Sequence, residues 1–396
     1  MRAPLSVALV LLALGACRSS GDDPSRTDGG ATDDGGGVTN DGGTADAPVG
    51  DGAVTDAGGT GTPSIQFIGR WDDSDALGPK TAWPGSRVVA RFDGTDATAK
   101  ITQTNGPLGG PTFVDVVVDG KAITTSLSGT QTVEIAKGLS PGLHTIEIVK
   151  RTESLFGTVR FEGFTFTGGN GLSPPTPRRS RRIEVLGDSW IDGVGVDGDK
   201  ATSCAGGAPP QFDDVRKGVA SKTADLVGAD VHVMGYRGKG LARNADGQSN
   251  DTFATIFART IPEVDAPWQF SVYVPDAVVI LLGAADFDGA GNASGNLQNA
   301  YNLLLNDLHT RYGNTTPLVL TVPPSVKGAS RAALETIIDA VIAGRLNADK
   351  PYNHKLVLPE SSATDETGCL GHPNAAHAAA MAPLVAAEIK KWTMWP

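Results

Sequence analysis

The sequence lacks a long hydrophobic run and an excess of positive charge. Its longest apolar stretch, residues 5–14, is about half as long as the roughly 20 residues that a membrane-spanning helix needs. A helical integral membrane protein is therefore excluded. The net charge of −11 also argues against a nucleic-acid-binding role, because such proteins present basic surfaces to the phosphate backbone. With 40% hydrophobic and 6% aromatic residues, the composition suits a soluble globular chain.

Motifs for metal ions and nucleotide cofactors are also missing. The 6 histidines are scattered, and none forms a pair at metal-ligand spacing beside a cysteine or carboxylate cluster, so no metal site is expected. The glycines of Gly235–Gly240 follow a predicted strand but do not form the G-x-G-x-x-G pattern of dinucleotide-binding loops. The chemistry of this protein is therefore expected to need no cofactor.

The first 63 residues are predicted to export and tether the chain. Arg2, an apolar stretch and the small residues before Cys17 resemble a bacterial lipoprotein signal over residues 1–17, in which Cys17 would be acylated. An ordinary cleaved signal with an incidental cysteine is the alternative. Residues 18–63 contain no aromatic side chain, so we predict a disordered Gly/Asp-rich linker. We expect an exported protein, lipid-anchored at the outer membrane or cell surface, that meets the membrane only through this anchor.

Residues 64–170 have the pattern of an antiparallel β-sandwich. Short β-rich runs alternate with turn residues such as Asp119-Gly120. The clearest runs cover residues 86–92, 112–118 and 144–149. Residues 171–182 follow, with glycines, prolines and a basic cluster at 178–182, and are predicted to be an interdomain linker. In an acidic, exported protein this cluster is interpreted as a solvated linker and not as a nucleic-acid patch.

From residue 183 to 396, buried apolar strands alternate with helices. The predicted strands cover residues 183–186, 231–234, 277–282, 318–322 and 355–358. Apolar residues recur at helical spacing over residues 297–308 and 334–342. This alternation predicts a three-layer α/β/α domain with a mostly parallel sheet. Ligands of such sheets bind beyond the carboxyl ends of the strands, so the residues after each strand are the first candidates for function.

Two polar residues at these positions suggest nucleophilic catalysis. Ser189 follows the first strand in Gly187-Asp188-Ser189, and His372 precedes the last predicted helix. This is the order expected of a Ser–His pair on an open α/β sheet. An imidazole is needed because a serine hydroxyl is a weak nucleophile near neutral pH until a base takes its proton. For an isolated Gly-Asp-Ser triplet, a serine that only caps a helix is the alternative.

Further segments match one family, in order along both predicted domains. They are Ile68-Gly69-Arg70, Trp83-Pro84-Gly85-Ser86, Phe92-Asp93-Gly94-Thr95, Gly187-Asp188-Ser189, Gly238-Lys239-Gly240, Arg243-Asn244, Gly283 with Asp286-Phe287, and Gly368-Cys369 followed by His372-Pro373-Asn374 and His377. With these segments, residues 183–396 resemble the SGNH (GDSL-type) hydrolases. The whole of residues 65–392 resembles carbohydrate esterase family 2, which joins a jelly-roll domain to an SGNH domain and deacetylates plant polysaccharides.

The resemblance implies catalytic roles for particular residues. Ser189 would be the nucleophile, and His372 would act as general base and then as general acid. The backbone amides of Ser189 and Gly238 would bind the oxyanion. His377 would be a further contact of the site or of the substrate, although a surface or packing histidine is the more ordinary interpretation.

Two positions depart from the family pattern. Ala285 stands where an asparagine would supply a third oxyanion donor, and Leu370 stands where many members carry an aspartate before the histidine. Losing such a donor or such an acid lowers turnover by about 10²–10⁴-fold in other serine hydrolases. Asp365 or Glu366, from the same loop, or a backbone carbonyl would then have to orient His372.

The function implied by the resemblance is that of a carbohydrate O-acetyl esterase. It would remove acetyl groups from hemicellulose of the xylan or mannan type through an acyl-enzyme, so its partner would be an acetylated polysaccharide or oligosaccharide. Two alternatives stay open. One is a catalytically impaired carbohydrate-binding protein with an SGNH fold, and the other is a general SGNH esterase or lipase for simple esters.

Cys204 and Cys369 are predicted to form a disulfide. If Cys17 is acylated, they are the two remaining cysteines of an exported chain, which matures in an oxidising compartment. Cys204 follows Ser189 by fifteen residues and Cys369 precedes His372 by three, so the bond would tie the serine loop to the histidine loop. Two free buried thiols are the alternative.

Overall fold

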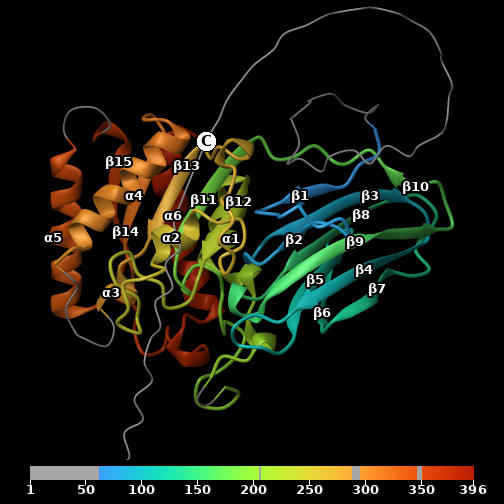
Figure 1. The fold of residues 1–396 in the computed structure, drawn as a ribbon, viewed down its shortest axis with the longest axis horizontal. Helices are drawn as coiled ribbons and strands as arrows, with labels where there is room; N and C mark the ends of the chain where they lie inside the picture. The colour runs from blue at the N-terminus through green and yellow to red at the C-terminus, as the bar shows by residue number, and fades with distance from the viewer. Residues whose placement is uncertain (1–61, 205–206, 288–294, 346–349) are drawn as a thin grey trace, which may run out of the picture. The chain divides into compact units, whose positions relative to one another are not determined.

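The computed structural model describes residues 62–204, 207–287, 295–345 and 350–396 (Figure 1). The expected signal with Cys17, and the expected linker up to residue 61, lie outside the described residues. Among the helices of the described ranges, none combines the length and the apolar character needed to cross a bilayer.

The N-terminal part of the described chain consists of two antiparallel sheets. The first sheet has the order β1-β3-β8-β5-β6, with β10 also paired to β3, and the second has the order β2-β9-β4-β7. The strands are β1 (Gln66–Ile68), β2 (Lys80–Thr81), β3 (Arg87–Asp93), β4 (Asp96–Thr104), β5 (Thr112–Val118), β6 (Lys121–Leu127), β7 (Thr130–Ala136), β8 (Leu143–Lys150), β9 (Thr158–Thr167) and β10 (Gly171–Ser173). The prediction of antiparallel sheets in this region is confirmed.

Alternating side chains of the two sheets form the sandwich core. On β4, Ala97, Ala99 and Ile101 are buried while their neighbours are more exposed, as expected when successive side chains of a strand point to opposite faces. Phe92 on β3 is fully buried and stacks on Phe166 with ring centroids 4.8 Å apart. Burying a side chain of this size contributes about 1.5–3 kcal/mol to folding.

The segment expected as a linker over residues 171–182 is more ordered than predicted. Its first residues form β10, where Leu172 lies opposite Phe92, and Arg181 already begins the first strand of the second part. The basic cluster is also not simply solvated. The Arg178 Nε lies 3.2 Å from a carboxylate oxygen of Asp230 at the start of β12. Arg181 donates a 2.7 Å hydrogen bond to the Val227 carbonyl at the end of α1.

The second part contains a parallel sheet of five strands. Their order is β12-β11-β13-β14-β15, and every pair is parallel. The strands are β11 (Arg181–Gly187), β12 (Ala229–Gly235), β13 (Ala277–Leu281), β14 (Leu318–Val322) and β15 (Asn353–Val357). The helices are α1 (Val219–Val227), α2 (Phe253–Phe257), α3 (Ala284–Phe287), α4 (Leu297–Tyr312), α5 (Gly328–Gly344) and α6 (Ala375–Thr393). The prediction of a parallel sheet with interspersed helices is confirmed.

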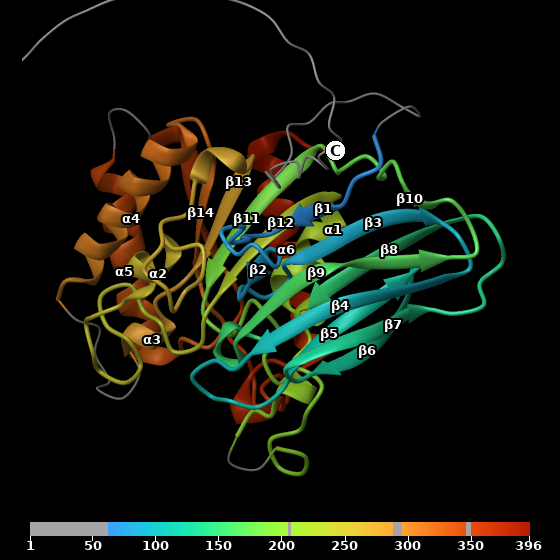
Figure 2. The same ribbon diagram turned by 45° about the vertical axis from the view of Figure 1, so that its right-hand side comes forward.

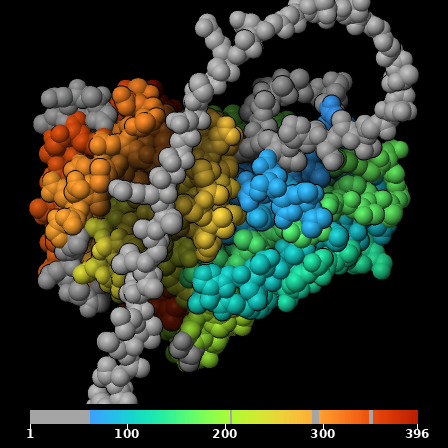
Figure 3. All heavy atoms as spheres, in the orientation of Figure 1, coloured from blue at the N-terminus to red at the C-terminus, as the bar shows by residue number. Residues whose placement is uncertain are grey.

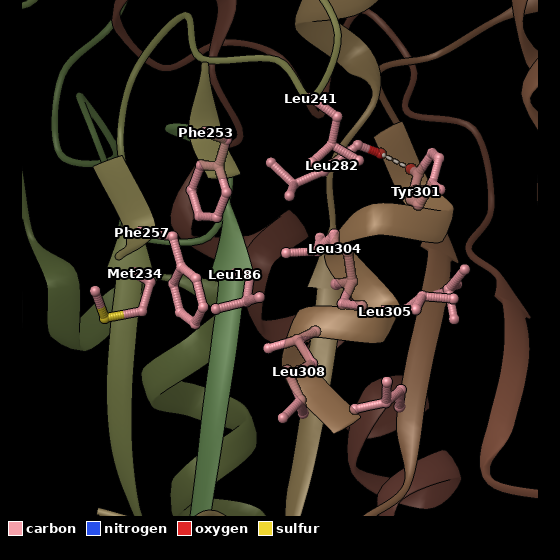
Figure 4. Close-up of a cluster of buried hydrophobic side chains, with 14 of the residues drawn as sticks. Leu186, Met234, Leu241, Phe253, Phe257, Leu282, Tyr301, Leu304, Leu305 and Leu308 are labelled. Carbon is pink, nitrogen blue, oxygen red and sulfur yellow. Dashed lines mark hydrogen bonds between the residues drawn. The ribbon is translucent and has the colours of Figure 1, made fainter. Parts of the chain in front are cut away.

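Each face of the parallel sheet carries its own hydrophobic core. Leu186 on β11 packs with Leu304 and Leu308 of α4 on one face, where the Tyr301 hydroxyl also donates a 2.7 Å hydrogen bond to the Leu282 carbonyl (Figure 4). On the other face, Val185 of the same strand packs with α1 and α6. Helices therefore cover both faces, which explains why these strands are apolar without alternation.

The sandwich packs directly against the parallel sheet (Figures 2 and 3). Trp83 belongs to the core on the α4 face, and Val149 belongs to the core on the α1 face. The buried Arg70 forms a salt bridge with Glu184 of β11, with 3.1 Å between Nη2 and Oε1. The two parts are thus connected by apolar packing and by a buried charge pair.

The register of the parallel strands brings three loops together. Gly187, the last residue of β11, lies opposite Gly235 on β12 and Leu281 on β13. The segments after these three residues therefore leave the sheet side by side at its carboxyl edge. This is where ligands of open α/β sheets bind.

Candidate active site

Ser189 and His372, far apart in the sequence, meet at this edge. The Ser189 Oγ lies 2.5 Å from the His372 Nε2. Ser189 follows β11 directly, and His372 lies just before α6, whose N-terminus is capped by the Asn374 side chain accepting from the His377 amide. Both residues are buried, since Ser189 exposes 5% of its surface and His372 exposes 8%. The arrangement can therefore transfer a proton from the serine hydroxyl to the imidazole.

The second ring nitrogen fixes the protonation of His372. Its Nδ1 donates a 2.7 Å hydrogen bond to the Cys369 carbonyl, which can only accept. The Nε2 is then free of a proton and accepts from the Ser189 hydroxyl, as a general base must. Burial lowers the pKa of His372 to about 4, the hydrogen bond to Cys369 acts in the opposite direction, and the charge of Arg237 lowers it further. The imidazole is consequently neutral at neutral pH.

The expectation that Asp365 orients His372 is not met. The Asp365 Oδ2 accepts hydrogen bonds from the Ser362 amide at 2.7 Å and from its hydroxyl at 2.6 Å. Glu366 is likewise occupied, in an ion pair with Lys327 at 2.7 Å. Asp365 thus stabilises its own loop, and Glu366 connects that loop to the start of α5. The backbone carbonyl that the sequence left open as an alternative orients the imidazole.

Leu370 and His377 lie beside the Ser–His pair without joining it. Leu370 has 49% of its surface exposed and adopts φ +57°. The His372 Nδ1 is bonded to the Cys369 carbonyl and not to an acid at position 370. His377 is buried in α6, with its Nδ1 3.5 Å from the Asp365 carboxylate. Its ring packs edge-on against Trp190, the neighbour of Ser189, with centroids 6.0 Å apart. His377 therefore packs against the serine loop.

Two backbone amides are available to bind an oxyanion. Within the described residues, neither the Ser189 amide nor the Gly238 amide donates to another backbone or side-chain group. Gly238 has φ +75°, a conformation that glycine adopts without strain. Ala285, at the position of the expected third donor, is 3% exposed and offers only a methyl group. The candidate oxyanion hole thus consists of backbone donors.

Asp286 shapes the loop that carries Gly238, a role that sequence reasoning missed. Its carboxylate is fully buried and accepts from the amides of Leu241, Ala242 and Arg243 at 2.9, 2.7 and 2.9 Å. Three such bonds hold the segment after β12 against α3. Asp286 was part of a matching motif. Its partners are backbone amides, which every residue except proline has, so the sequence could not show which amides it binds.

One positive charge stands close to the site. Arg237, next to Gly238, forms an ion pair with Glu153, in which its Nε lies 3.2 Å from Oε2. Glu153 lies just after β8, so a residue of the sandwich part holds an arginine of the candidate site in place. Across the described ranges, no three histidine, cysteine, aspartate or glutamate side chains are grouped so that they could hold a metal ion.

A disulfide connects the segment that follows Ser189, the serine loop, to the segment that precedes His372, the histidine loop. Cys204 and Cys369 are bonded, with Cα atoms 5.5 Å apart. Both are buried, and they pack with Val194, Ala208 and Phe212 in a small apolar cluster. The bond joins positions that are 165 residues apart in the chain, so it closes a long loop around most of the parallel sheet.

Comparison with known proteins gives matches over nearly all of the described chain. Residues 67–175 match the family model described as carbohydrate esterase 2 N-terminal. The chain is 30% identical over 335 residues to the cellulase/esterase CelE of Acetivibrio thermocellus, a match that covers 84% of this chain and 40% of CelE. It is 26% identical over 342 residues to an acetylxylan esterase / glucomannan deacetylase of Cellvibrio japonicus, covering 84% of this chain and 90% of that protein.

A solved structure is similar over its whole length. The family two carbohydrate esterase from Clostridium thermocellum, determined in complex with cellohexaose, is 30% identical, with a TM-score of 0.76. The superposition covers 84% of this chain and 100% of that structure. The described sandwich and parallel sheet therefore both have counterparts in one known protein.

Proposed function

Because this chain belongs to carbohydrate esterase family 2, we propose that it removes O-acetyl groups from hemicellulose of the xylan or mannan type. The observation that carries the proposal is the 2.5 Å contact between the Ser189 Oγ and the His372 Nε2 at the carboxyl edge of the sheet. The chain spans 40% of the length of CelE, and the match to the acetylxylan esterase / glucomannan deacetylase supports the substrate class.

Acylation begins with attack of the Ser189 hydroxyl on the acetyl carbonyl. His372 Nε2 accepts the hydroxyl proton as the new C–O bond forms, and the carbonyl oxygen becomes negatively charged. The amides of Ser189 and Gly238 stabilise this oxyanion. When the tetrahedral intermediate collapses, the protonated His372 donates the proton to the departing sugar oxygen, which leaves an acetyl group on Ser189.

Deacylation repeats the same proton transfers with water. His372 removes a proton from a water molecule, which attacks the acetyl-serine, and the same amides bind the second oxyanion. Collapse returns the proton to Ser189 Oγ and releases acetate. Every step uses groups of this chain, and the Cys369 carbonyl stabilises the imidazolium through its hydrogen bond to Nδ1.

Activity is expected to persist into the acidic range. The value of kcat/KM on an acetyl ester should be level down to about pH 5 and fall about tenfold per pH unit below the pKa of His372 at about 4, because the protonated Nε2 cannot accept the serine proton. Initial rates between about pH 3 and 8, with enzyme integrity checked after each incubation, measure this profile. An acidic limb near the ordinary histidine value of 6.5 would contradict it.

Acetate release from polymeric substrates tests the proposed function. Acetylated xylan and acetylated glucomannan are compared with simple aryl and alkyl acetates at equal acetyl concentration. A carbohydrate esterase releases acetate from the glycans with the higher kcat/KM. A preference for simple esters would support a general SGNH esterase or lipase, and binding of glycan without release would support a carbohydrate-binding protein.

A side-chain oxyanion donor at position 285 is expected to raise turnover. Ala285→Asn should increase kcat on an acetyl ester about tenfold or more, since a well-placed donor contributes about 3–4 kcal/mol to transition-state binding. Ala285→Leu is the matched control, because leucine has a similar shape and no donor. Steady-state kinetics of both variants decide the matter, and an equal kcat for the two would show that the site needs no third donor.

Impaired turnover is the second candidate, and Ala285 favours it. The residue is buried and carries only a methyl group, so position 285 of α3 offers no side-chain donor to the oxyanion. A protein with this defect could retain glycan binding at the same site. Isothermal titration with the unacetylated glycan, run beside the acetate assay, separates a weak esterase from a binding protein.

The proposal also places the enzyme on the cell exterior. Acylation of Cys17 would anchor it at the outer membrane or cell surface, and the disulfide between Cys204 and Cys369 supports maturation in an oxidising compartment. The sandwich would be of the jelly-roll type and the parallel-sheet domain of the SGNH type. Loss of membrane association in a Cys17→Ala variant, by fractionation, tests the anchor.

A further inference from the structure

The orientation of His372 depends on one backbone carbonyl. The Cys369 oxygen accepts both the Nδ1–H of His372, at 2.7 Å, and the His372 amide, at 3.1 Å. In a Ser–His–Asp triad, a buried carboxylate accepts the Nδ1–H of the histidine, and its own hydrogen bonds keep the carboxylate in place. A carbonyl can replace it only if the peptide that carries it is held equally well.

Cys369 is held at each of its other groups. Its amide donates a 3.0 Å hydrogen bond to the Gly195 carbonyl, and its sulfur is bonded to Cys204. Its side chain is fully buried. The turn that follows is strained, because Leu370 has φ +57° where a residue with a side chain costs roughly 1 kcal/mol or more. Such a turn persists only while its ends are anchored.

The serine loop approaches Cys369 too closely for any side chain between them. A Cβ on Gly195 would lie 2.5 Å from the Cys369 Cβ, and a Cβ on Gly198 would lie 2.2 Å from the Cys369 sulfur. Both glycines follow Ser189 by fewer than ten residues. Cys369 therefore contacts the backbone of Gly195 and the sulfur of Cys204 at the same time. Through these contacts the position of the histidine loop is fixed relative to the loop that carries Ser189.

We propose that the disulfide between Cys204 and Cys369 keeps the Cys369 carbonyl on the His372 Nδ1, so that turnover depends on this bond. This inference rests on the proposed roles of Ser189 and His372. Breaking the bond leaves the sandwich and the sheet folded but releases the histidine loop, and turnover falls. A dithiol reductant would do so by giving up two electrons and two protons, with two cysteine thiols and the cyclic disulfide of the reductant as products.

The test compares oxidised protein with a variant that lacks the bond. The full chain is prepared with Cys17→Ser in every sample, with and without Cys204→Ser and Cys369→Ser. Without the bond, kcat on an acetyl ester should fall at least about 100-fold, while KM changes less than about threefold, because the imidazole is misplaced but the parallel sheet and the sandwich keep their fold. NMR of isotope-labelled histidine nitrogens should show His372 leaving the Nδ1–H tautomer.

Two further samples separate positioning from stability. Gly195→Ala keeps the disulfide but pushes its Cβ into Cys369, so it should lower kcat and alter the tautomer in the same way. If the serine variant does not fold, the folded protein is reduced with dithiothreitol and then reoxidised. The reduced and reoxidised samples are then compared in place of the variant and the oxidised protein. Phe92→Leu removes packing from the sandwich core, whose cluster contains no residue of either loop, and should lower the melting temperature with kcat and the tautomer unchanged.

The outcomes distinguish the inference from the proposed function. An unchanged kcat and an Nδ1–H tautomer in the folded, bond-free protein would overturn the positioning role and leave the disulfide as a structural cross-link. If a Ser189→Ala variant keeps its activity, the proposed function fails instead, whereas the tautomer still reports whether Cys369 orients His372. Loss of kcat with loss of the tautomer, in bond-free and Gly195→Ala protein alike, supports the inference.

Discussion

Ser189→Ala is expected to lower kcat for acetate release by on the order of 10⁵–10⁶-fold, with little change in KM. The Oγ that lies 2.5 Å from His372 Nε2 supplies the bond that forms in the transition state, and a methyl group cannot replace it. The backbone oxyanion donors and the rest of the site remain, so residual rate above the uncatalysed reaction and normal substrate binding are both expected.

The matched comparison is with His372→Ala and with the double variant. Each single variant should cost nearly as much as the two together, because a serine without its base and a base without its serine both fail at the same step. Ser126→Ala, on an exposed strand of the sandwich, controls for expression and handling and should be unchanged. The rates are measured as acetate released from acetylated glycan.

Covalent labelling gives an independent measurement of the same assignment. A serine-directed phosphonate should modify Ser189 in the native protein, and the adduct should disappear in His372→Ala because the hydroxyl is no longer activated. Mass spectrometry of the digested protein locates the adduct. Modification of another serine, with Ser189 unmodified and activity lost, would show that the nucleophile lies elsewhere.

The elements around the site were predictable because their signal is local. Apolar runs such as residues 277–282 match β13 to within one residue, since a strand buried on both faces has no polar positions to obscure it. The strand-end rule then identified Ser189 correctly as a residue of the carboxyl edge, and the spacing of Cys204 and Cys369 to the two loops indicated their proximity. These inferences need only residue identity and order.

What escaped prediction depends on backbone groups. The partner of His372 is the Cys369 carbonyl. The sequence left a backbone carbonyl open beside Asp365 and Glu366, but every residue has a carbonyl, so residue identity could not show which one it is. The three amides that Asp286 binds were invisible for the same reason. The basic cluster at residues 178–182 was interpreted as solvated because its acidic partner, Asp230, lies about fifty residues further along the chain.

Arg70→Met is expected to destabilise the fold more than most single substitutions, by about 3–5 kcal/mol. The Arg70 guanidinium is fully buried, pairs with Glu184 at 3.1 Å and donates to the Phe257 and Arg259 carbonyls. Methionine retains much of the aliphatic volume but leaves the buried Glu184 carboxylate on β11 without its cation. Equilibrium unfolding in denaturant measures the loss.

A second substitution separates the charge from the packing. Glu184→Gln alone leaves Arg70 as a buried cation and should also destabilise, whereas Arg70→Met combined with Glu184→Gln removes both charges and should recover much of the stability. The Tyr312 hydroxyl, which donates to Glu184 Oε2 at 2.7 Å, can still donate to a glutamine oxygen. A double variant as unstable as the sum of the singles would indicate that packing around the guanidinium dominates.

The pH dependence gives the sharpest test of this explanation. Burial already raises the pKa of Glu184, and the nearby Arg70 charge acts against that rise. In Arg70→Met the folded-state pKa of Glu184 rises further above its unfolded value, so the folded protein binds a proton that the unfolded chain releases. Its deficit in unfolding free energy relative to the native protein should therefore shrink as pH falls from 7 toward about 5. A deficit independent of pH would mean that lost contacts with the surrounding aromatic rings, and not an unpaired carboxylate, account for the destabilisation.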